Sequence, residues 1–185
     1  VDIARVWSES GVKVPQVLAF DEANGFMLLE DFGDTLLHPE LTAEAADGLY
    51  KSAMDSLIEL QQLPKTDNIP AYDRGLLERE MDLFPDWLCE KHLGLVLSAK
   101  ERAMLTNVFD ILAESALAQP QAIVHRDYHS RNLMVTDERN PGILDFQDAV
   151  EGPFTYDLVS LLKDCYVRWP EDQVRQWARD FYTAS

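Results

Sequence analysis

Hydrophobic and polar positions near the start of the chain predict one helix and then a β-hairpin. An amphipathic stretch over residues 2–10 is typical of a short helix. Apolar runs at 14–20 and 26–30 have strand length, and the polar turn 21–25 between them favours an antiparallel pair. A second turn, at 31–34, ends this small β-rich unit.

Beyond that turn the apolar spacing changes to the period of a helix. A first helix is expected from Thr42 to Pro64, because apolar side chains recur there every three or four positions. A second, acidic helix is expected over 73–92, with a kink at Pro85. Four large apolar side chains would form its inward face: Leu77, Met81, Phe84 and Leu88.

The rest of the chain predicts one capped helix, several short strands and two further helices. Ser98 and Glu101 form a capping box, which predicts a helix over 99–117. The remaining elements are expected to be strands 122–124, 133–135 and 142–144, with a polar turn 137–141 between the last two, and helices 155–166 and 170–185. This order indicates an α+β architecture, in which a pair of strands lies inside a mostly helical part.

Composition places the chain among folded globular proteins and excludes some classes of partner. It has 185 residues, of which 46% are hydrophobic and 10% aromatic, enough for one sizeable core. A formal net charge of −17 offers no basic surface, so we expect neither nucleic acid nor an anionic membrane as a partner. No apolar run reaches the roughly 18 residues of a membrane span. The two cysteines lie outside any zinc spacing, which favours reduced thiols and a cytoplasmic location.

The most informative segment is 125–132, which reads His-Arg-Asp-Tyr-His-Ser-Arg-Asn and is followed by a hairpin that leads to Asp145. Short apolar runs bracket these polar residues, so loops at strand ends would present them together. Phosphoryl transfer needs a carboxylate that deprotonates a hydroxyl, and hard oxygen ligands that hold Mg²⁺ against ATP. Asp127 suits the first task, and Asn132 and Asp145 suit the second. Any one of the three alone would more often be a turn former or a helix cap.

With this motif the chain resembles the aminoglycoside phosphotransferase and choline kinase branch of the protein-kinase-like fold. Residues 125–134 and 144–149 are especially similar to those of bacterial anomeric sugar kinases, which phosphorylate N-acetylmuramate and N-acetylglucosamine in cell-wall recycling. The run 152–166 strengthens the match, which extends over essentially the whole chain. The resemblance implies a partial N-terminal lobe over 1–34, made of a helix and a β-hairpin. A mostly helical C-terminal catalytic lobe, carrying a β-hairpin, would cover 35–185.

The resemblance also implies roles for individual residues. Asp127 would be the catalytic base, and Asn132 and Asp145 would bind Mg²⁺. Backbone groups would hold the adenine of ATP, which would receive a hydrogen bond from the Phe32 amide and donate one to the Glu30 carbonyl. ATP and Mg²⁺ are therefore the expected cofactors.

Three further side chains are candidates for contact with the substrate. His129 and Arg131 lie inside the catalytic loop, where they could meet phosphate or sugar oxygens. Arg168, next to Trp169, suits a sugar acid, because a guanidinium pairs with a carboxylate and an aromatic ring covers a sugar face. A purely structural role remains an open interpretation for all three. Asp157 is expected to anchor the loop to the helix that follows it.

Two parts of a complete kinase of this type are not found in the sequence. No glycine-rich phosphate loop occurs, and no lysine lies on an apolar strand before the hinge at 28–32, since Lys13 falls in a turn. We therefore expect a piece of a longer sugar kinase that would be poorly active alone. Two alternatives stay open. One is a kinase of the same fold that acts on an aminoglycoside or a choline-type alcohol, and the other is a non-catalytic kinase-like interaction domain.

Overall fold

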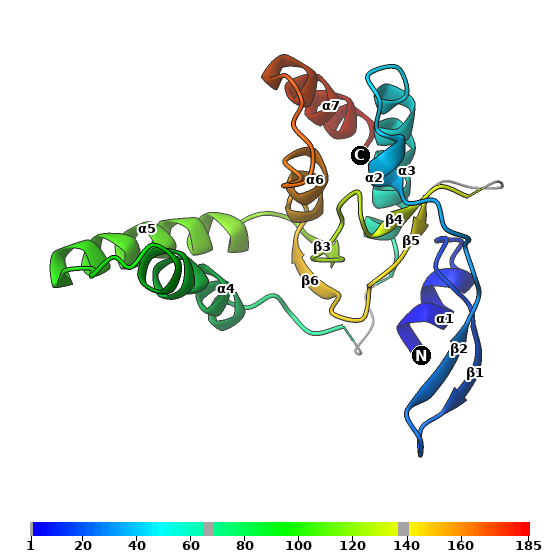
Figure 1. Ribbon diagram of the computed structural model, residues 1–185, viewed down its shortest axis with the longest axis horizontal. Coiled ribbons are helices and arrows are strands. Elements are labelled where there is room, and N and C mark those ends of the chain that lie inside the picture. The colour runs from blue at the N-terminus through cyan, green and yellow to red at the C-terminus, as the bar shows by residue number, and fades with distance from the viewer. Residues whose placement is uncertain (1, 65–68, 137–140) are drawn as a thin grey trace.

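The structure is a computed structural model that describes residues 2–64, 69–136 and 141–185. Its elements are, in chain order, α1 (Asp2–Glu9), β1 (Val17–Asp21), β2 (Phe26–Leu29), α2 (Leu37–Glu40), α3 (Ala46–Gln61), α4 (Arg74–Met81), the π-helix η1 (Phe84–His92), α5 (Ala99–Leu117), β3 (Gln121–Val124), β4 (Leu133–Met134), β5 (Gly142–Ile143), β6 (Val150–Pro153), α6 (Tyr156–Leu162) and α7 (Glu171–Ala184). Short strands occupy the centre, and α4 and α5 extend from it as an arm (Figure 1).

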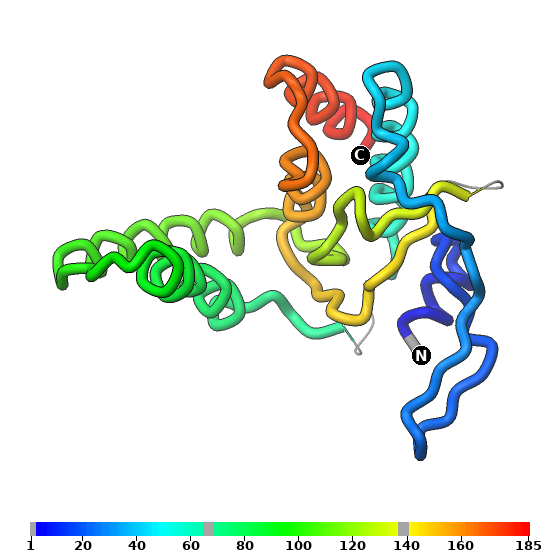
Figure 2. The backbone as a smooth tube through the Cα atoms, viewed as in Figure 1, coloured from blue at the N-terminus to red at the C-terminus, as the bar shows by residue number. Residues whose placement is uncertain are grey.

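The expected N-terminal helix and hairpin are confirmed. Trp7 of α1 is buried, and its ring centroid lies 5.3 Å from that of Phe146, so the helix packs on the segment after β5. β1 and β2 pair antiparallel and project at one corner of the molecule (Figure 2). Six large apolar side chains of this hairpin are exposed: Leu18, Phe20, Phe26, Met27, Leu28 and Leu29. The division of the chain at 31–34 into two lobes stays a prediction.

The main core lies between α3, α6 and α7. Tyr50 of α3 is fully buried, and its ring stacks on Trp177 of α7 with the centroids 4.3 Å apart. Trp169 completes this aromatic group, because its Nε1–H donates to the Tyr50 hydroxyl at 3.0 Å. α6 is shorter than expected and ends at Leu162. The segment after it turns back to residues 125–132, named the catalytic loop here for the role that the sequence predicts. There the Asp164 carboxylate accepts the Ser130 amide at 3.0 Å.

The arm corrects the expectation of one kinked helix over 73–92. α4 begins at the Asp73 cap, whose carboxylate accepts the Leu76 amide at 2.8 Å, and it ends at Met81. Pro85 explains that end, because it has no N–H to donate to the Met81 carbonyl and its ring clashes with that group. The chain then continues as the π-helix η1.

The predicted inward face of this region is wrong in its second half. Leu77 is buried as expected, but Phe84 and Leu88 are 46% and 43% exposed, and Pro85 and Cys89 are buried in their place. The longer turn of a π-helix, with its i→i+5 pattern, moves side chains away from the positions that an α-helical period predicts. α5 forms as expected over 99–117, and its capping box is confirmed.

Two strand pairs form the centre. β4 pairs with β5 as expected, although all of the turn expected between them except Pro141 lies outside the described residues. A Cβ on Gly142 would lie 2.6 Å from the Phe32 ring, so β5 closely approaches the segment after β2. β6 was not predicted, and it pairs antiparallel with β3. Within the described part of the chain, no helix is both long enough and apolar enough to cross a membrane.

Candidate active site

Strand β3 leads the polar motif into the centre of the molecule. Val124 is buried, and the His125 side chain that follows is fully buried. The His125 Nε2–H donates to the Leu144 carbonyl at 2.8 Å, and its Nδ1 accepts the Asp127 amide at 3.2 Å. These partners require a neutral imidazole, because a second ring proton would face the Asp127 amide. Burial lowers the pKa of His125 to about 4, which agrees with that assignment.

Asp157 of α6 fixes the backbone of the catalytic loop. Its side chain is buried, and its carboxylate oxygens accept the His125 amide at 2.6 Å and the Arg126 amide at 3.0 Å. The expected anchor between the loop and the following helix is therefore confirmed. Burial raises the pKa of Asp157 to about 7, although both amides favour the ionised form. Arg126 has a φ of 79°, so the anchor holds a strained backbone directly before Asp127.

The hairpin β4–β5 brings Asn132 and Asp145 to Asp127. The Leu144 amide donates to the Asn132 carbonyl at 2.9 Å, which continues the pairing of the strands by one step. Asn132 Nδ2 donates to the Asp127 carbonyl at 3.0 Å and lies 3.5 Å from Asp145 Oδ2. The structure thus brings together the three polar residues that the sequence singled out.

The oxygen atoms at this point fit Mg²⁺. Both partners of Asn132 Nδ2 are hydrogen-bond acceptors, and these contacts orient the side-chain amide. The Oδ1 atom of the same amide is therefore available to bind a cation. Asp145 is exposed, and Gln147, which sequence reasoning missed, donates to its Oδ1 at 2.7 Å. No three His, Cys, Asp or Glu side chains cluster as ligands among the described residues. Nucleotide phosphates and water would therefore complete the coordination, as Mg²⁺ prefers.

The segment after β2 lines a pocket in which Glu30 and Phe32 lie beside Lys13. The Glu30 amide donates to the Gln16 carbonyl at 2.8 Å, whereas the Gln16 amide donates to the Glu30 carboxylate at 3.2 Å. In a regular antiparallel pair the Glu30 carbonyl would accept that amide. Strand pairing therefore does not use this carbonyl. Lys13, expected only in a turn, has its Nζ 3.5 Å from Glu30 Oε1 and 5.0 Å from the Phe32 ring centroid.

Two of the three candidate substrate residues gather around Tyr166. The Arg131 guanidinium lies 4.6 Å from the Tyr166 ring centroid, and the His129 ring meets that ring edge-on at 5.5 Å. Arg168 is exposed two positions after Tyr166 and forms no hydrogen bond or ion pair with the described part of the chain. It is therefore not brought to the catalytic loop by any contact of its own.

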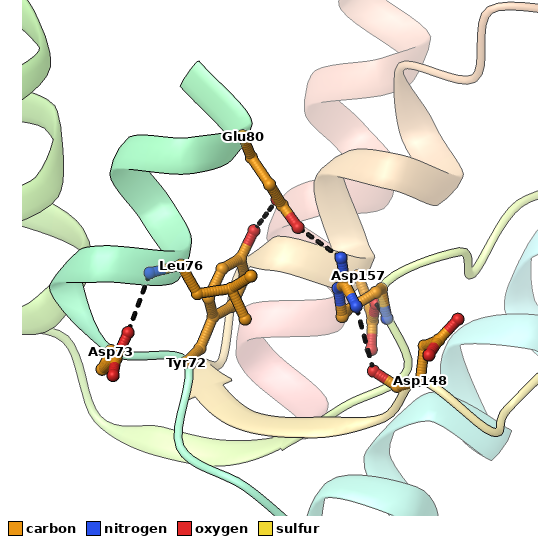
Figure 3. Close-up of polar contacts among 7 residues, drawn as sticks. Tyr72, Asp73, Leu76, Glu80, Asp148 and Asp157 are labelled. Carbon is orange, nitrogen blue, oxygen red and sulfur yellow. Dashed lines mark hydrogen bonds and ion pairs between the residues drawn. The ribbon is translucent and has the colours of Figure 1, made fainter. Parts of the chain in front are cut away.

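A further pocket opens beside Asp127, between the catalytic loop and α4. Its wall is largely apolar with a few polar groups: it is lined by Tyr72, Leu77, Glu80, Met81, Leu83, Arg126, Asp127 and Tyr156. Glu80 points from α4 toward Tyr72 and the loop (Figure 3). Sequence reasoning missed Glu80, because one glutamate in an acidic helix gives no signal of its own.

Comparison with known sequences identifies one family and several close relatives. A family model described as the phosphotransferase enzyme family matches residues 1–185. An N-acetylmuramate/N-acetylglucosamine kinase from Pseudomonas putida is 44% identical over 182 residues, which are 98% of this chain and 53% of that protein. A kinase of the same name from Pseudomonas aeruginosa is 47% identical over 174 residues, 94% of this chain and 51% of that protein. The chain thus spans about half the length of these curated relatives.

Solved structures with a similar fold are more distant in sequence. An aminoglycoside phosphotransferase from Streptomyces rimosus, in complex with ADP and streptomycin, matches with a TM-score of 0.71 at 15% identity, over 98% of this chain and 72% of that one. A choline/ethanolamine kinase family protein from Mesorhizobium loti matches with a TM-score of 0.64 at 20% identity, over 97% of this chain and 59% of that one. At this level of identity the likeness extends to the fold alone.

Proposed function

This chain belongs to the phosphotransferase enzyme family and has its protein-kinase-like fold, and from that premise we propose that the full-length protein transfers the γ-phosphate of ATP to a sugar hydroxyl. The convergence of Asp127, Asn132 and Asp145 carries the proposal. Phosphoryl transfer requires a base and metal ligands close together, since the reaction depends mainly on positioning the reacting groups and on neutralising the charge of the phosphates.

Asp127 is the catalytic base of the proposed reaction. Its amide is held by His125 Nδ1, and its carbonyl accepts Asn132 Nδ2 at 3.0 Å and the His129 amide at 2.9 Å. The backbone is fixed on both sides, while the carboxylate stays exposed beside the pocket. A hydroxyl bound in that pocket would donate to the carboxylate, which takes the proton as the oxygen attacks the γ-phosphate.

Asn132 and Asp145 are the residues that would hold Mg²⁺, through the Asn132 Oδ1 and the Asp145 carboxylate. Bound there, Mg²⁺ would neutralise the charge of the ATP phosphates. The Glu30 carbonyl and the Phe32 amide would bind the adenine ring at the hinge pocket. This assignment draws support from the Glu30 carbonyl, which strand pairing does not use.

The acceptor is the anomeric hydroxyl of N-acetylmuramate or N-acetylglucosamine. Relatives that carry those names are 44% and 47% identical over nearly the whole chain. A hemiacetal hydroxyl is more acidic than an ordinary alcohol, so a carboxylate is a sufficient base for it. The apolar wall of the pocket beside Asp127 would cover one sugar face, while Arg168, His129 and Arg131 are the proposed partners of carboxylate and phosphate oxygens. These sugars would arise from the cell wall. The proposed role of the enzyme is therefore cell-wall recycling, and its proposed location is the cytoplasm.

The test supplies the full-length protein with Mg·ATP and four separate acceptors: N-acetylmuramate, N-acetylglucosamine, kanamycin and choline. We expect a sugar 1-phosphate from one or both amino sugars, identified by its coupling to the anomeric proton in ³¹P NMR. Turnover of kanamycin or choline, with none of either amino sugar, would instead favour a kinase of the same fold with another acceptor. No turnover of any acceptor, together with no ATP binding, would favour a non-catalytic domain.

A further inference from the structure

An ion pair joins the arm of the molecule to the catalytic loop. Glu80 of α4 pairs with Arg126, 46 positions further along the chain. Their side chains are only 27% and 26% exposed, so the pair is partly removed from water. Figure 3 shows Glu80 reaching down from α4 to a guanidinium that lies between it and Asp148. A pair in this environment interacts more strongly than one on the open surface.

Glu80 is itself held in place by Tyr72. The Tyr72 hydroxyl donates to the second oxygen of the Glu80 carboxylate. Burial, together with the hydrogen bond to Glu80, raises the pKa of Tyr72 far above its ordinary value, so this hydroxyl keeps its proton. The Tyr72 amide donates to the Glu151 carbonyl of β6 at 2.7 Å, and a Cβ on Gly152 would lie 2.9 Å from the Tyr72 side chain. The carboxylate of Glu80 is therefore fixed against the central strands as well as against α4.

Arg126 has few other ways to hold its side chain. Its second terminal nitrogen donates to the Asp148 carbonyl at a long 3.4 Å, and its buried Nε has no hydrogen-bond partner among the described residues. The backbone of Arg126 is in the left-handed region, with a φ of 79°, a strained conformation for a residue that carries a side chain. A contact that favours this backbone conformation at Arg126 also determines the direction in which the side chain of the next residue, Asp127, points.

We infer that Glu80 and Arg126 are positioning residues: their ion pair holds the loop so that the Asp127 carboxylate faces the acceptor pocket. This inference rests on the proposed function, since it concerns the same base. Leu77 and Met81 of α4 line that pocket, so one helix supplies both the apolar wall and the anchor of the loop. The acceptor and the base are thereby held at a fixed spacing.

Two substitutions test the pair in the full-length protein. Glu80→Gln removes the charge with little change in shape, and we expect kcat to fall about 10- to 100-fold while the KM values for ATP and acceptor change less than about threefold. Glu78→Gln is the matched control, because Glu78 lies on the same helix, is 46% exposed and pairs only with Arg74, at 3.6 Å, in the described chain. Arg126→Gly frees the backbone at a φ that glycine adopts readily, so it should preserve or raise the melting temperature and still lower kcat.

The pair also predicts coupling between the two sites. Glu80→Gln should add little to the loss of kcat in Arg126→Gly, because the interaction is already absent there. Arg126→Lys, which keeps the charge, should recover part of the rate. A raised acceptor KM with an unchanged kcat would overturn the inference, since it would make Glu80 a ligand of the substrate. Additive effects of the two substitutions would also overturn it.

Hydrogen exchange separates this inference from the proposed reaction. The amides of His125, Arg126 and Asp127 are all hydrogen-bonded, so they should exchange slowly in the wild type. We expect faster exchange of a peptide covering 125–127 in Glu80→Gln and not in Glu78→Gln, whether or not any acceptor is turned over. Equal exchange in the two variants would overturn the positioning role even if the kinase activity is demonstrated.

Discussion

Within the described residues, hydrogen bonds to its backbone, and none to its side chain, fix Asp127. Its amide and carbonyl are hydrogen-bonded to His125, His129 and Asn132, while the carboxylate remains exposed. A substitution that changes only the carboxylate therefore leaves these contacts in place. At the scale of a single residue, the chemistry can be removed without disturbing the fold.

The first prediction concerns the base. Asp127→Asn in the full-length protein should lower kcat by roughly 10²- to 10⁴-fold, because the amide cannot accept the proton. The affinity for Mg·ATP and the melting temperature should stay close to those of the wild type. Steady-state kinetics and calorimetric titration measure these quantities, and near-normal turnover would remove the assignment of Asp127.

The second prediction concerns the metal site. Asp145→Ala should abolish Mg²⁺-dependent binding of ATP, since the carboxylate is a principal oxygen ligand of the proposed site. Asp148→Asn is the control, because Asp148 is also an exposed acid of this segment and contacts Arg126 only through its carbonyl. Calorimetric titration of each variant with ATP, with and without Mg²⁺, should separate them. Equal loss in both variants, or in neither, would contradict the site.

The third prediction uses the buried imidazole. His125 should remain neutral, with its proton on Nε2, from pH 8 down to about pH 5, because burial lowers its pKa to about 4. ¹⁵N-edited NMR of the metal-free protein shows the tautomer and the titration. A histidine that titrates near pH 6.5 would contradict the assigned hydrogen bonds.

The same shift affects stability. The unfolded chain binds a proton at this histidine below about pH 6.5, and the folded chain only near pH 4. Protonation of His125 therefore lowers the free energy of unfolding by up to about 3 kcal/mol as the pH falls through that window. The raised pKa of Asp157 acts in the opposite sense, since its contribution is lost as the pH rises from about 4 to about 7. The difference between wild type and His125→Asn in urea unfolding isolates the histidine. The free energy of unfolding of the wild type, relative to that of His125→Asn, should fall as the pH is lowered from about 6.5 to about 4.

At the scale of an element, α5 shows how a short local signal can determine a helix end. The Ser98 hydroxyl accepts the Glu101 amide at 3.3 Å, and the Glu101 carboxylate accepts the Ser98 amide at 2.8 Å. Both groups satisfy amides that the first turn of a helix leaves without partners. These bonds are local, so the sequence alone predicted this helix start correctly.

The fourth prediction follows from that cap. Ser98→Ala should lower the free energy of unfolding by about 1 kcal/mol, because the Glu101 amide loses the Ser98 hydroxyl as its acceptor. Ser115→Ala serves as the control, since Ser115 is exposed inside the same helix and alanine is the better helix former there. Urea unfolding followed by circular dichroism measures both. An equal effect of the two substitutions would mean that the cap does not stabilise the helix.

Elements that depend on distant contacts were harder to predict. β6 contains Gly152 and Pro153, which read as a turn, and it forms because Val124 and its neighbours in β3 supply a partner. The outward Phe84 shows the same limit, since only the π-helix explains its position. In the site, motif spacing was sufficient to predict that Asp127, Asn132 and Asp145 lie together, and their roles stay a proposal. Glu80 acts through a contact 46 positions away, which no local pattern signals.

At the scale of the whole molecule, a high negative charge is combined with exposed apolar surface. The formal net charge is −17, yet Phe26 is 71% and Leu28 59% exposed on the β1–β2 hairpin. Apolar strands at an edge favour association, while the charge opposes it. Salt weakens only the second effect, since it screens charges beyond about 10 Å at 0.1 M.

The fifth prediction is therefore that salt promotes association of the 185-residue chain. Sedimentation velocity should show larger species in about 0.3 M NaCl than in about 0.02 M NaCl, because the Debye length falls severalfold. Phe26→Thr combined with Leu28→Thr should reduce this association while preserving strand propensity. A monomer at both salt concentrations would show that the hairpin surface does not mediate self-association.

The absence of a side chain at Gly142 has a consequence for nucleotide binding. The Phe32 ring occupies the space that a Cβ would need, and Asp145 follows three positions later in the same segment. In the proposed site, this contact would connect the adenine end at Phe32 with the metal end at Asp145, so we expect binding at the two ends to be coupled. Adenine binding at one end and Mg²⁺ binding at the other should change each other's affinity by the same factor, because such linkage is reciprocal. The methyl group of Gly142→Ala would displace the Phe32 ring. Calorimetric titration of this variant should therefore show that its affinity for adenosine and its Mg²⁺-dependent affinity for ATP both fall.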